Sequence, residues 1–503
     1  MGIAVSLIFI MFYALSTLRI MPPGRRVRLL TKSEILKKLL LVCALAWGNV
    51  HAAGLPAEIL SALKAAKLPG DSLSLAIVPL QSSQPALYFQ GDKPSSPAST
   101  MKLVTTYAGL SLLGPAYQWT TEISSTVKPV NGILNGDLYI KGYGDPKLNL
   151  ERFWLMLRDL KAAGVKEIRG DLVLDRSFFS VSDENTPYDD DGDEPYRPFL
   201  VSPDSLLSNL KSVRLTLRAE AGGVVTSLEP NLAAVHIDNR LSSSPAASCE
   251  AVKNKLQLAV DNQGSSAKIV LSGSMPTGCT GERYLALLDH PSYTASLFRS
   301  LWAEQGGVIS GVNRAGLVPA EAQVLLTARS PDLANVIRDI NKFSNNTMAR
   351  QLYLSLGTGE AGKDSSAKSF AAVSHWLNSR GKQFDELKME NGSGLSRQEQ
   401  ISARHMAELL IDAWQSPYAA EFISSLPLVA LDGTMKKRLG SMVGEAHIKT
   451  GTLRDVRAAA GYVRDVNGQT SVVVAMINHP QATAGLPVLD EILRFVHRRV
   501  AKP

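Results

Sequence analysis

The sequence contains few of the residues that mark several protein classes. It has 3 cysteines, 26 prolines and 38 glycines among 503 residues, so composition excludes disulfide-dense, collagen-like and disordered chains. Its 8 histidines are scattered and no His-Glu-x-x-His motif occurs, so metal catalysis has no support and no cofactor is indicated. A globular protein remains, and at about 100–200 residues per domain we expect two to four domains.

The net charge of +7 is concentrated at the N-terminus. Residues 1–52 carry seven basic side chains and one acidic side chain, which leaves about +1 for residues 53–503. A nearly neutral remainder gives no electrostatic case for nucleic acid as a partner.

The basic N-terminal region has the pattern of an export signal. Lys37 and Lys38 precede the apolar run 39–47, and small residues follow around Ala52. This order predicts a secretory signal peptide, cleaved after Ala52, and a periplasmic protein. An earlier apolar segment, 3–18, is short of the roughly 20 residues that span a membrane. Met21 follows it, so the segment is either an anchor or the result of a misassigned start.

Two cysteines remain after this cleavage, Cys249 and Cys279. In an exported chain we expect them to form one disulfide, which would close a loop of about 30 residues and stabilise the fold by roughly 3 kcal/mol. The alternative is a pair of buried thiols.

Hydrophobic periodicity separates a strand-rich middle from two helix-rich ends. Strands are expected at 73–79 and 86–89, followed by a helix from Ser99. From about residue 118 to 288 short alternating segments dominate, and one pattern occurs twice, at 135–140 and 169–174. Helices return from about residue 292, and the Asn467-Gly468 turn predicts a hairpin between two tail strands.

These patterns predict an α+β chain in which the two ends form one domain. The expected limits are a leader at 1–52, a catalytic domain at 53–117 and 290–503, an inserted domain II at 118–206 and 274–289, and a β-rich inserted domain III at 207–273.

Three short motifs carry the chemistry. Ser99 and Lys102 lie three residues apart at a helix start, where a desolvated lysine can take the hydroxyl proton. Seven Ser-x-x-Lys matches occur, so this pattern alone is weak. Ser344-Asn345-Asn346 and Lys449-Thr450-Gly451 are single occurrences. Separately, Ser344 could be a helix N-cap and Lys449 an edge-strand lysine, but the ordered set favours a catalytic site.

In this order the motifs resemble those of the penicillin-recognising serine enzymes. The interval of 245 residues between Ser99 and Ser344 is similar to that of the D-alanyl-D-alanine carboxypeptidase/endopeptidase family, the class C low-molecular-mass penicillin-binding proteins. The family more often has Asp at the position of Asn391. Supporting matches are Gly144-Asp145-Pro146, the segments 341–346 and 391–397, and Asp432-Gly433-Thr434.

The resemblance covers residues 54–500 and implies a DD-peptidase/β-lactamase-like fold. In this fold an antiparallel sheet with flanking helices and a helical subdomain would be split by mainly β inserted domains. By the same resemblance, Ser99 would be the acylating nucleophile and Lys102 its general base. Ser344 would relay protons to the leaving amine, Lys449 would hold that hydroxyl and the substrate carboxylate, and Asn346 would bond the substrate amide.

The resemblance also implies a substrate-binding strand at Thr450, Gly451 and Thr452. The strand would lie antiparallel to the substrate peptide, with Thr450 reaching its terminal carboxylate. Backbone N–H groups of Ser99 and Thr452 would form the oxyanion hole, a contact worth roughly 3–4 kcal/mol per donor.

We therefore expect a periplasmic serine D-Ala-D-Ala carboxypeptidase, with DD-endopeptidase activity, that acts on peptidoglycan stem peptides and is acylated by β-lactams. A homodimer is left open. The acidic run 189–194 is either a solvated loop or a site for the amino group of a diamino acid in the stem peptide. The alternative functions are a β-lactamase or esterase on the same fold, and a catalytically idle peptidoglycan-binding scaffold.

Overall fold

The computed structural model describes residues 54–81, 84–181, 196–245, 248–249, 256–358 and 365–499. The expected signal peptide and the acidic run 189–194 lie outside these ranges. In the part of the chain that is described, no helix combines the length and the hydrophobicity needed to cross a membrane.

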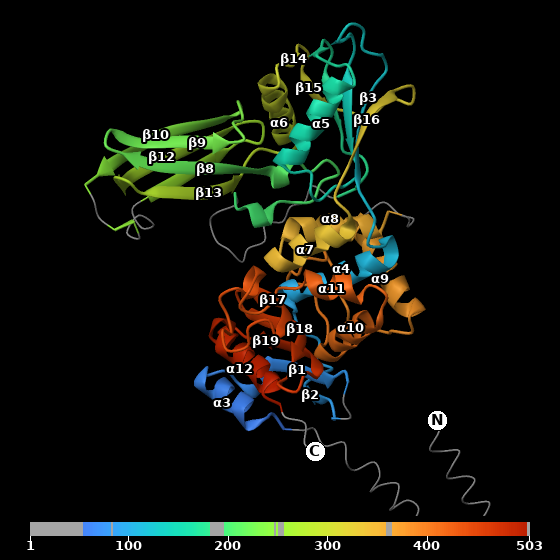
Figure 1. Cartoon of the computed structure of the whole chain (residues 1–503), viewed down its shortest axis with the longest axis vertical. Coiled ribbons are helices and arrows are strands. Elements are labelled where there is room, and N and C mark those ends of the chain that lie inside the picture. The colour runs from blue at the N-terminus through green and yellow to red at the C-terminus, as the bar shows by residue number, and fades with distance from the viewer. Residues whose placement is uncertain are drawn as a thin grey trace, which may run out of the picture. The chain divides into compact units, whose positions relative to one another are not determined.

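A five-stranded antiparallel sheet joins the two ends of the described chain (Figure 1). Leu73 pairs with Ile477 across more than 400 residues of sequence. The hairpin predicted at Asn467-Gly468 connects two adjacent antiparallel strands, as expected. In sheet order the strands are β17 (Ala446–Leu453), β18 (Val456–Arg464), β19 (Thr470–Asn478), β1 (Leu73–Pro79) and β2 (Leu87–Phe89).

The two faces of this sheet belong to separate hydrophobic cores, because successive side chains of a strand point to opposite faces. In β19, Val472 and Val474 join one core, whereas Val473 and Ala475 join the other. The first core includes residues of α4 (Lys102–Leu113) and α10 (Ala403–Gln415), and the second includes residues of α3 (Ala57–Ala65) and α12 (Leu486–His497).

Helix α4 lies at the centre of the helical part of the fold. All residues from Lys102 to Leu110 are buried, which is the pattern of a helix covered on every side. The helix begins three residues later than expected, because Ala98–Met101 forms a 3₁₀ turn and Ala98 has φ 44°. Its neighbours are α7 (Leu333–Phe343), α8 (Asn346–Leu356), α9 (Ser365–Ser379) and α11 (Ala419–Ser425).

A second five-stranded sheet contains the repeated pattern. Leu138 pairs with Leu172 in parallel, so the two copies of the pattern lie side by side in matching register. Arg314 forms ion pairs with both Asp137 and Asp171, one from each copy. The strands in order are β15 (Asn313–Ala315), β7 (Leu172–Asp175), β5 (Leu138–Gly142), β3 (Thr120–Ser125) and β16 (Gln323–Arg329).

Smaller elements share a core with this second sheet. A short sheet of β14 (Val308–Ile309), β6 (Glu167–Ile168) and β4 (Ile133–Leu134) accompanies α5 (Leu150–Ala162) and α6 (His290–Glu304).

The β-rich region consists of two three-stranded sheets. The expected limit of domain III at residue 273 falls inside β12 and leaves out β13, which pairs with β8. The periodicity of isolated strands did not reveal this pairing. The sheets are β13 (Thr280–Ala286), β8 (Ser212–Glu220) and β9 (Gly223–Glu229), and β10 (Val235–Ser244), β12 (Ala267–Pro276) and β11 (Leu256–Asn262).

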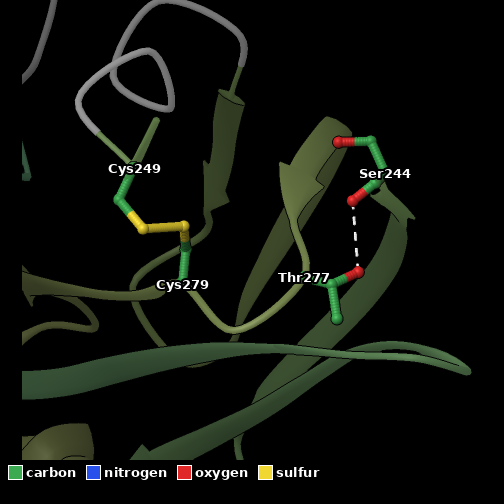
Figure 2. The surroundings of a disulfide bond; sticks show 4 residues. All are labelled: Ser244, Cys249, Thr277 and Cys279. Carbon is green, nitrogen blue, oxygen red and sulfur yellow. Dashed lines mark hydrogen bonds between the residues drawn. A yellow bond between two sulfur atoms is a disulfide. The ribbon is translucent and has the colours of Figure 1, made fainter. Parts of the chain in front are cut away.

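Cys249 and Cys279 form the expected disulfide in this region, with a Cα–Cα distance of 5.7 Å (Figure 2). Beside it, the Thr277 hydroxyl donates to the backbone carbonyl of Ser244 at 3.1 Å. The disulfide therefore links the turn before β13 to the segment that follows β10.

Candidate active site

Ser99 lies in the 3₁₀ turn that precedes α4. Its neighbours Ala98, Thr100 and Met101 are buried, whereas Ser99 is partly exposed. Both the backbone N–H and the hydroxyl of Thr100 donate to the carbonyl of Pro97, at 3.1 and 2.7 Å. These two hydrogen bonds stabilise the turn, and the hydroxyl of the partly exposed Ser99 remains accessible to a substrate.

Lys102 is fully buried next to this hydroxyl. Its Nζ donates to Ser99 Oγ at 3.0 Å, to Asn346 Oδ1 at 2.7 Å and to the backbone carbonyl of Ser393. Burial first, and the charge of Lys449 second, hold the pKa of Lys102 well below its usual value. A low pKa favours the neutral amine, which can accept the proton of Ser99.

Lys449 and Ser344 form a second hydroxyl–amine pair. Lys449 Nζ donates to Ser344 Oγ at 2.9 Å and to the Thr450 carbonyl at 2.7 Å. Although β17 is an edge strand, Lys449 is fully buried, and this burial lowers its pKa to about 7. Lys449 thus lies on an edge strand, as the alternative interpretation expected, but its amine is buried and bonded to Ser344.

Ser344 connects α7 to α8 in a left-handed conformation, with φ 57° and ψ 37°. The N-cap of α8 is Asn345, whose side chain accepts from the N–H of Met348. The alternative role of Ser344 as the N-cap is wrong for this reason, and its hydroxyl is bonded by Lys449 instead.

Strand β17 packs against the Ser99 turn at Gly451. A Cβ atom on Gly451 would lie 2.7 Å from the Pro97 carbonyl oxygen and 3.1 Å from the Ser99 nitrogen. Thr450, one residue earlier, has its hydroxyl 2.9 Å from that of Thr434. The close approach explains the glycine and brings the expected substrate-binding strand next to Ser99.

The inserted region forms a wall of the site with residues that were not singled out from the sequence. Asn346 Nδ2 donates to the Phe199 carbonyl at 3.3 Å, and the Thr347 hydroxyl donates to the Val201 carbonyl at 3.0 Å. No motif marks these carbonyl groups. The side chains of Phe199 and Leu200 pack against Ala98, Leu395, Leu453 and Val456.

A loop that includes Asn391 completes the site. Asn391 Oδ1 accepts from the N–H and the hydroxyl of Ser393, at 2.9 and 2.6 Å, and its Nδ2 donates to the Leu395 carbonyl at 2.9 Å. The loop also contains the Ser393 carbonyl that Lys102 reaches. A residue beyond the motif, Glu399, accepts from the backbone of this loop and was not singled out from the sequence.

Acid–base chemistry in this site rests on two amines and two hydroxyls. Within the described ranges, no cluster of three or more His, Cys, Asp or Glu side chains could hold a metal ion. An accessible serine beside a buried lysine, with a second serine–lysine pair near it, is suited to nucleophilic acyl transfer. The fold and the site therefore define the class of serine acyl-transfer enzymes.

Comparison with known families specifies the class further. The model of the D-Ala-D-Ala carboxypeptidase 3 (S13) family matches residues 55–497. The chain belongs to this family, and the expected enzyme class, a serine D-Ala-D-Ala carboxypeptidase, is confirmed.

Curated relatives support the same assignment. A D-alanyl-D-alanine carboxypeptidase of Actinomadura sp. is 29% identical over 422 residues, which covers 80% of this chain and 77% of that protein. The D-alanyl-D-alanine carboxypeptidase DacB of Haemophilus influenzae is 25% identical over 427 residues, which covers 82% and 86% of the two chains.

Solved structures confirm the predicted α+β fold. Penicillin binding protein 4 from Haemophilus influenzae superimposes with a TM-score of 0.72 at 22% identity, and the match covers 88% of this chain and 99% of that one. The same protein in complex with a β-lactam gives a TM-score of 0.69.

Proposed function

We propose that this chain is a periplasmic D-Ala-D-Ala carboxypeptidase that works through a Ser99 acyl-enzyme and also opens peptidoglycan cross-links as a DD-endopeptidase. The observation that carries the proposal is the contact of 3.0 Å between Lys102 Nζ and Ser99 Oγ, made by a lysine with no solvent exposure. The signal-like pattern in residues 1–52 supports export.

In the acylation step, Ser99 Oγ attacks the carbonyl carbon of the penultimate D-Ala and its proton moves to Lys102 Nζ. The C–N bond to the terminal residue then breaks. Ser344 Oγ gives its proton to the leaving amine and regains one from Lys449 Nζ, which lies 2.9 Å away. Before deacylation the proton gained by Lys102 passes to Lys449, so both amines regain their starting states. Water then attacks the ester carbonyl while Lys102 accepts a proton from it, and Lys102 gives this proton to Ser99 Oγ as the ester C–O bond breaks.

The substrate peptide would add a strand at the outer edge of β17 along residues 450–452, because the start of this edge is already bonded: the Ile448 N–H donates to the Pro427 carbonyl at 2.8 Å. Its terminal carboxylate would then meet Thr450 and the charged form of Lys449. The N–H groups of Ser99 and Thr452 would bind the developing oxyanion, which is worth roughly 3–4 kcal/mol of barrier per donor.

We propose the domain limits in the same terms. Residues 53–117 and 290–503 form the catalytic domain, and the inserted residues divide into domain II and a β-rich unit that extends through β13 to Ala286. The pairing of β13 with β8 supports this extension. A homodimer stays an open proposal.

Two measurements test the activity. Labelled penicillin should attach to the wild type and not to Ser99→Ala. Ser379→Ala is a matched control, because Ser379 begins another Ser-x-x-Lys match on the exposed end of α9. Failure to label the wild type, or equal labelling of Ser99→Ala, would refute the proposal.

Mass spectrometry of muropeptides incubated with residues 53–503 separates the two activities. Loss of terminal D-Ala indicates carboxypeptidase activity, and conversion of cross-linked dimers to monomers indicates endopeptidase activity. Faster turnover of penicillin than of peptide would favour the β-lactamase alternative, and binding without turnover would favour the scaffold.

A further inference from the structure

Glu399 is a buried carboxylate in the loop beside the catalytic lysine. It is 2% exposed. Its Oε1 accepts from the backbone N–H groups of Glu390, Asn391 and Gly392, at 3.1, 2.9 and 2.7 Å, and its Oε2 accepts from that of Gly394 at 2.7 Å. One side chain therefore fixes four peptide groups within five consecutive residues.

These peptide groups surround the carbonyl that Lys102 reaches. Ser393, whose carbonyl accepts from Lys102 Nζ, lies between the bonded residues Gly392 and Gly394. The loop also packs closely against the turn Ala98–Met101 that contains Ser99, because a Cβ on Gly394 would lie 1.9 Å from the Ala98 carbonyl oxygen. A shift of the loop would consequently move the hydrogen-bond acceptor of Lys102.

Glu399 also contributes the negative charge of this cluster. Its charge raises the pKa of Lys102, opposing the larger effects of burial and of Lys449, and it attracts the guanidinium of Arg350, as does Glu390. Burial raises the pKa of Glu399, and the four N–H groups that donate to its carboxylate oppose this effect by stabilising the ionised form.

The negative charge near Lys102 comes from a residue that the family resemblance did not indicate. The family resemblance led us to expect an acid at position 391, where this chain has Asn391. The neutral Asn391 bonds within the loop, to Ser393 and Leu395. The carboxylate enters from Glu399, eight residues further along the chain.

We propose that Glu399 is a positioning residue for acylation: it holds the loop of residues 390–394 so that the Ser393 carbonyl fixes Lys102 next to Ser99, and it balances the positive charge of the buried amines. The inference rests on the proposed function, because its effect is on the acylation step.

The test compares Glu399→Gln and Glu399→Asp with the wild type in the rate of acylation by labelled penicillin from pH 5 to 9. Glu386→Gln is the matched control. Glu386 is also a largely buried acid, and its carboxylate accepts from the N–H of Ser402 at 2.8 Å and contacts His405 Nδ1 at 2.8 Å.

In Glu399→Gln an amide N–H₂ group faces the N–H of Gly394, and the negative charge is lost. We expect acylation to slow by about tenfold to 100-fold, the usual effect of losing a hydrogen bond to a charged group. The limiting rate should fall more than the affinity of the initial complex. The acidic limb of the pH profile should move to lower pH, because Lys102 loses an anion that raises its pKa.

Glu399→Asp keeps the charge but is one methylene shorter, so it should slow acylation and leave the acidic limb in place. Glu386→Gln should change neither property. Acylation of Glu399→Gln at the wild-type rate with an unmoved limb would overturn the inference. If Glu399→Gln does not fold, a wild-type rate for Glu399→Asp would overturn it instead. Absence of labelling in the wild type would refute the proposed function itself.

Discussion

We expect the buried Lys449 side chain to lower the free energy of unfolding of this protein. The side chain is fully buried, and burial lowers its pKa from the usual 10.5 to about 7. The difference between these pKa values corresponds to about 5 kcal/mol of free energy of unfolding at neutral pH. Lys449→Met removes this cost with a side chain of similar length. Loss of the bonds to Ser344 and Thr450 offsets about 2 kcal/mol, so we expect the variant to be more stable by about 3 kcal/mol.

The direction of the Lys449 pKa shift determines how the stability difference between the variant and the wild type depends on pH. The folded pKa lies below the unfolded one, so the unfolded chain binds more protons between pH 7 and 10.5. Wild-type stability should therefore rise with pH across this window. The advantage of Lys449→Met should be largest at pH 7 and below. Because the lost bonds offset about 2 kcal/mol, the advantage should disappear at about pH 9 and change sign by about pH 10.

Urea unfolding at pH 7, 8.5 and 10 measures this difference directly. The control is Lys342→Met, which makes the same substitution at a buried lysine that forms an ion pair with Asp432 at 2.6 Å. This control should be less stable than the wild type at pH 7, because it removes the partner of a carboxylate. A Lys449→Met variant that is less stable than the wild type at pH 7, or whose difference does not vary with pH, would refute the reasoning. Penicillin labelling of Lys449→Met should be much slower in either case.

Two further substitutions test the packing and electrostatics around the site. Gly394→Ala should abolish penicillin labelling, because its Cβ would meet the Ala98 carbonyl; Gly381→Ala also has a positive φ but meets open space, and should label normally. Equal labelling rates would contradict the steric argument. Burial raises the pKa of Asp145 to about 6, so the folded state loses stability as pH rises through 6. Asp145→Asn should therefore increase the free energy of unfolding at pH 8 by up to about 3 kcal/mol and raise the melting temperature at pH 8 but not at pH 4. An equal rise in melting temperature at the two pH values would contradict this.

Local sequence signals predicted the elements that local forces determine. The strand 73–79 has the expected bounds, and a helix begins at His290, close to the expected residue 292, because hydrophobic periodicity is set within each segment. The turn at Asn467-Gly468 needs only its own dipeptide. Ser99 and Lys102 could be paired from their spacing, since three residues at a helix start suffice to bring them together.

Contacts between distant segments could not be predicted in this way. From the sequence, an acidic residue in a polar segment such as Glu399 is expected to be exposed to solvent. Its burial depends on how the loop folds over α4. The backbone carbonyl of Phe199 carries no side-chain signal at all. The pairing of β13 with β8 joins residues more than 60 positions apart, so it could not guide the choice of a domain limit at residue 273.

The contacts of Asn346 connect the inserted region to Lys102. The Phe199 carbonyl can only accept a hydrogen bond, so it selects the N–H₂ end of the Asn346 amide, at 3.3 Å. The amide oxygen is thereby turned toward Lys102 Nζ, at 2.7 Å. Gln351, on the same helix, exchanges two hydrogen bonds with the backbone of Asp204 and anchors the inserted segment there. The inserted region thus orients a hydrogen-bond acceptor for Lys102, which we propose as the general base, so part of the interval between Ser99 and Ser344 would assist the proposed acyl transfer.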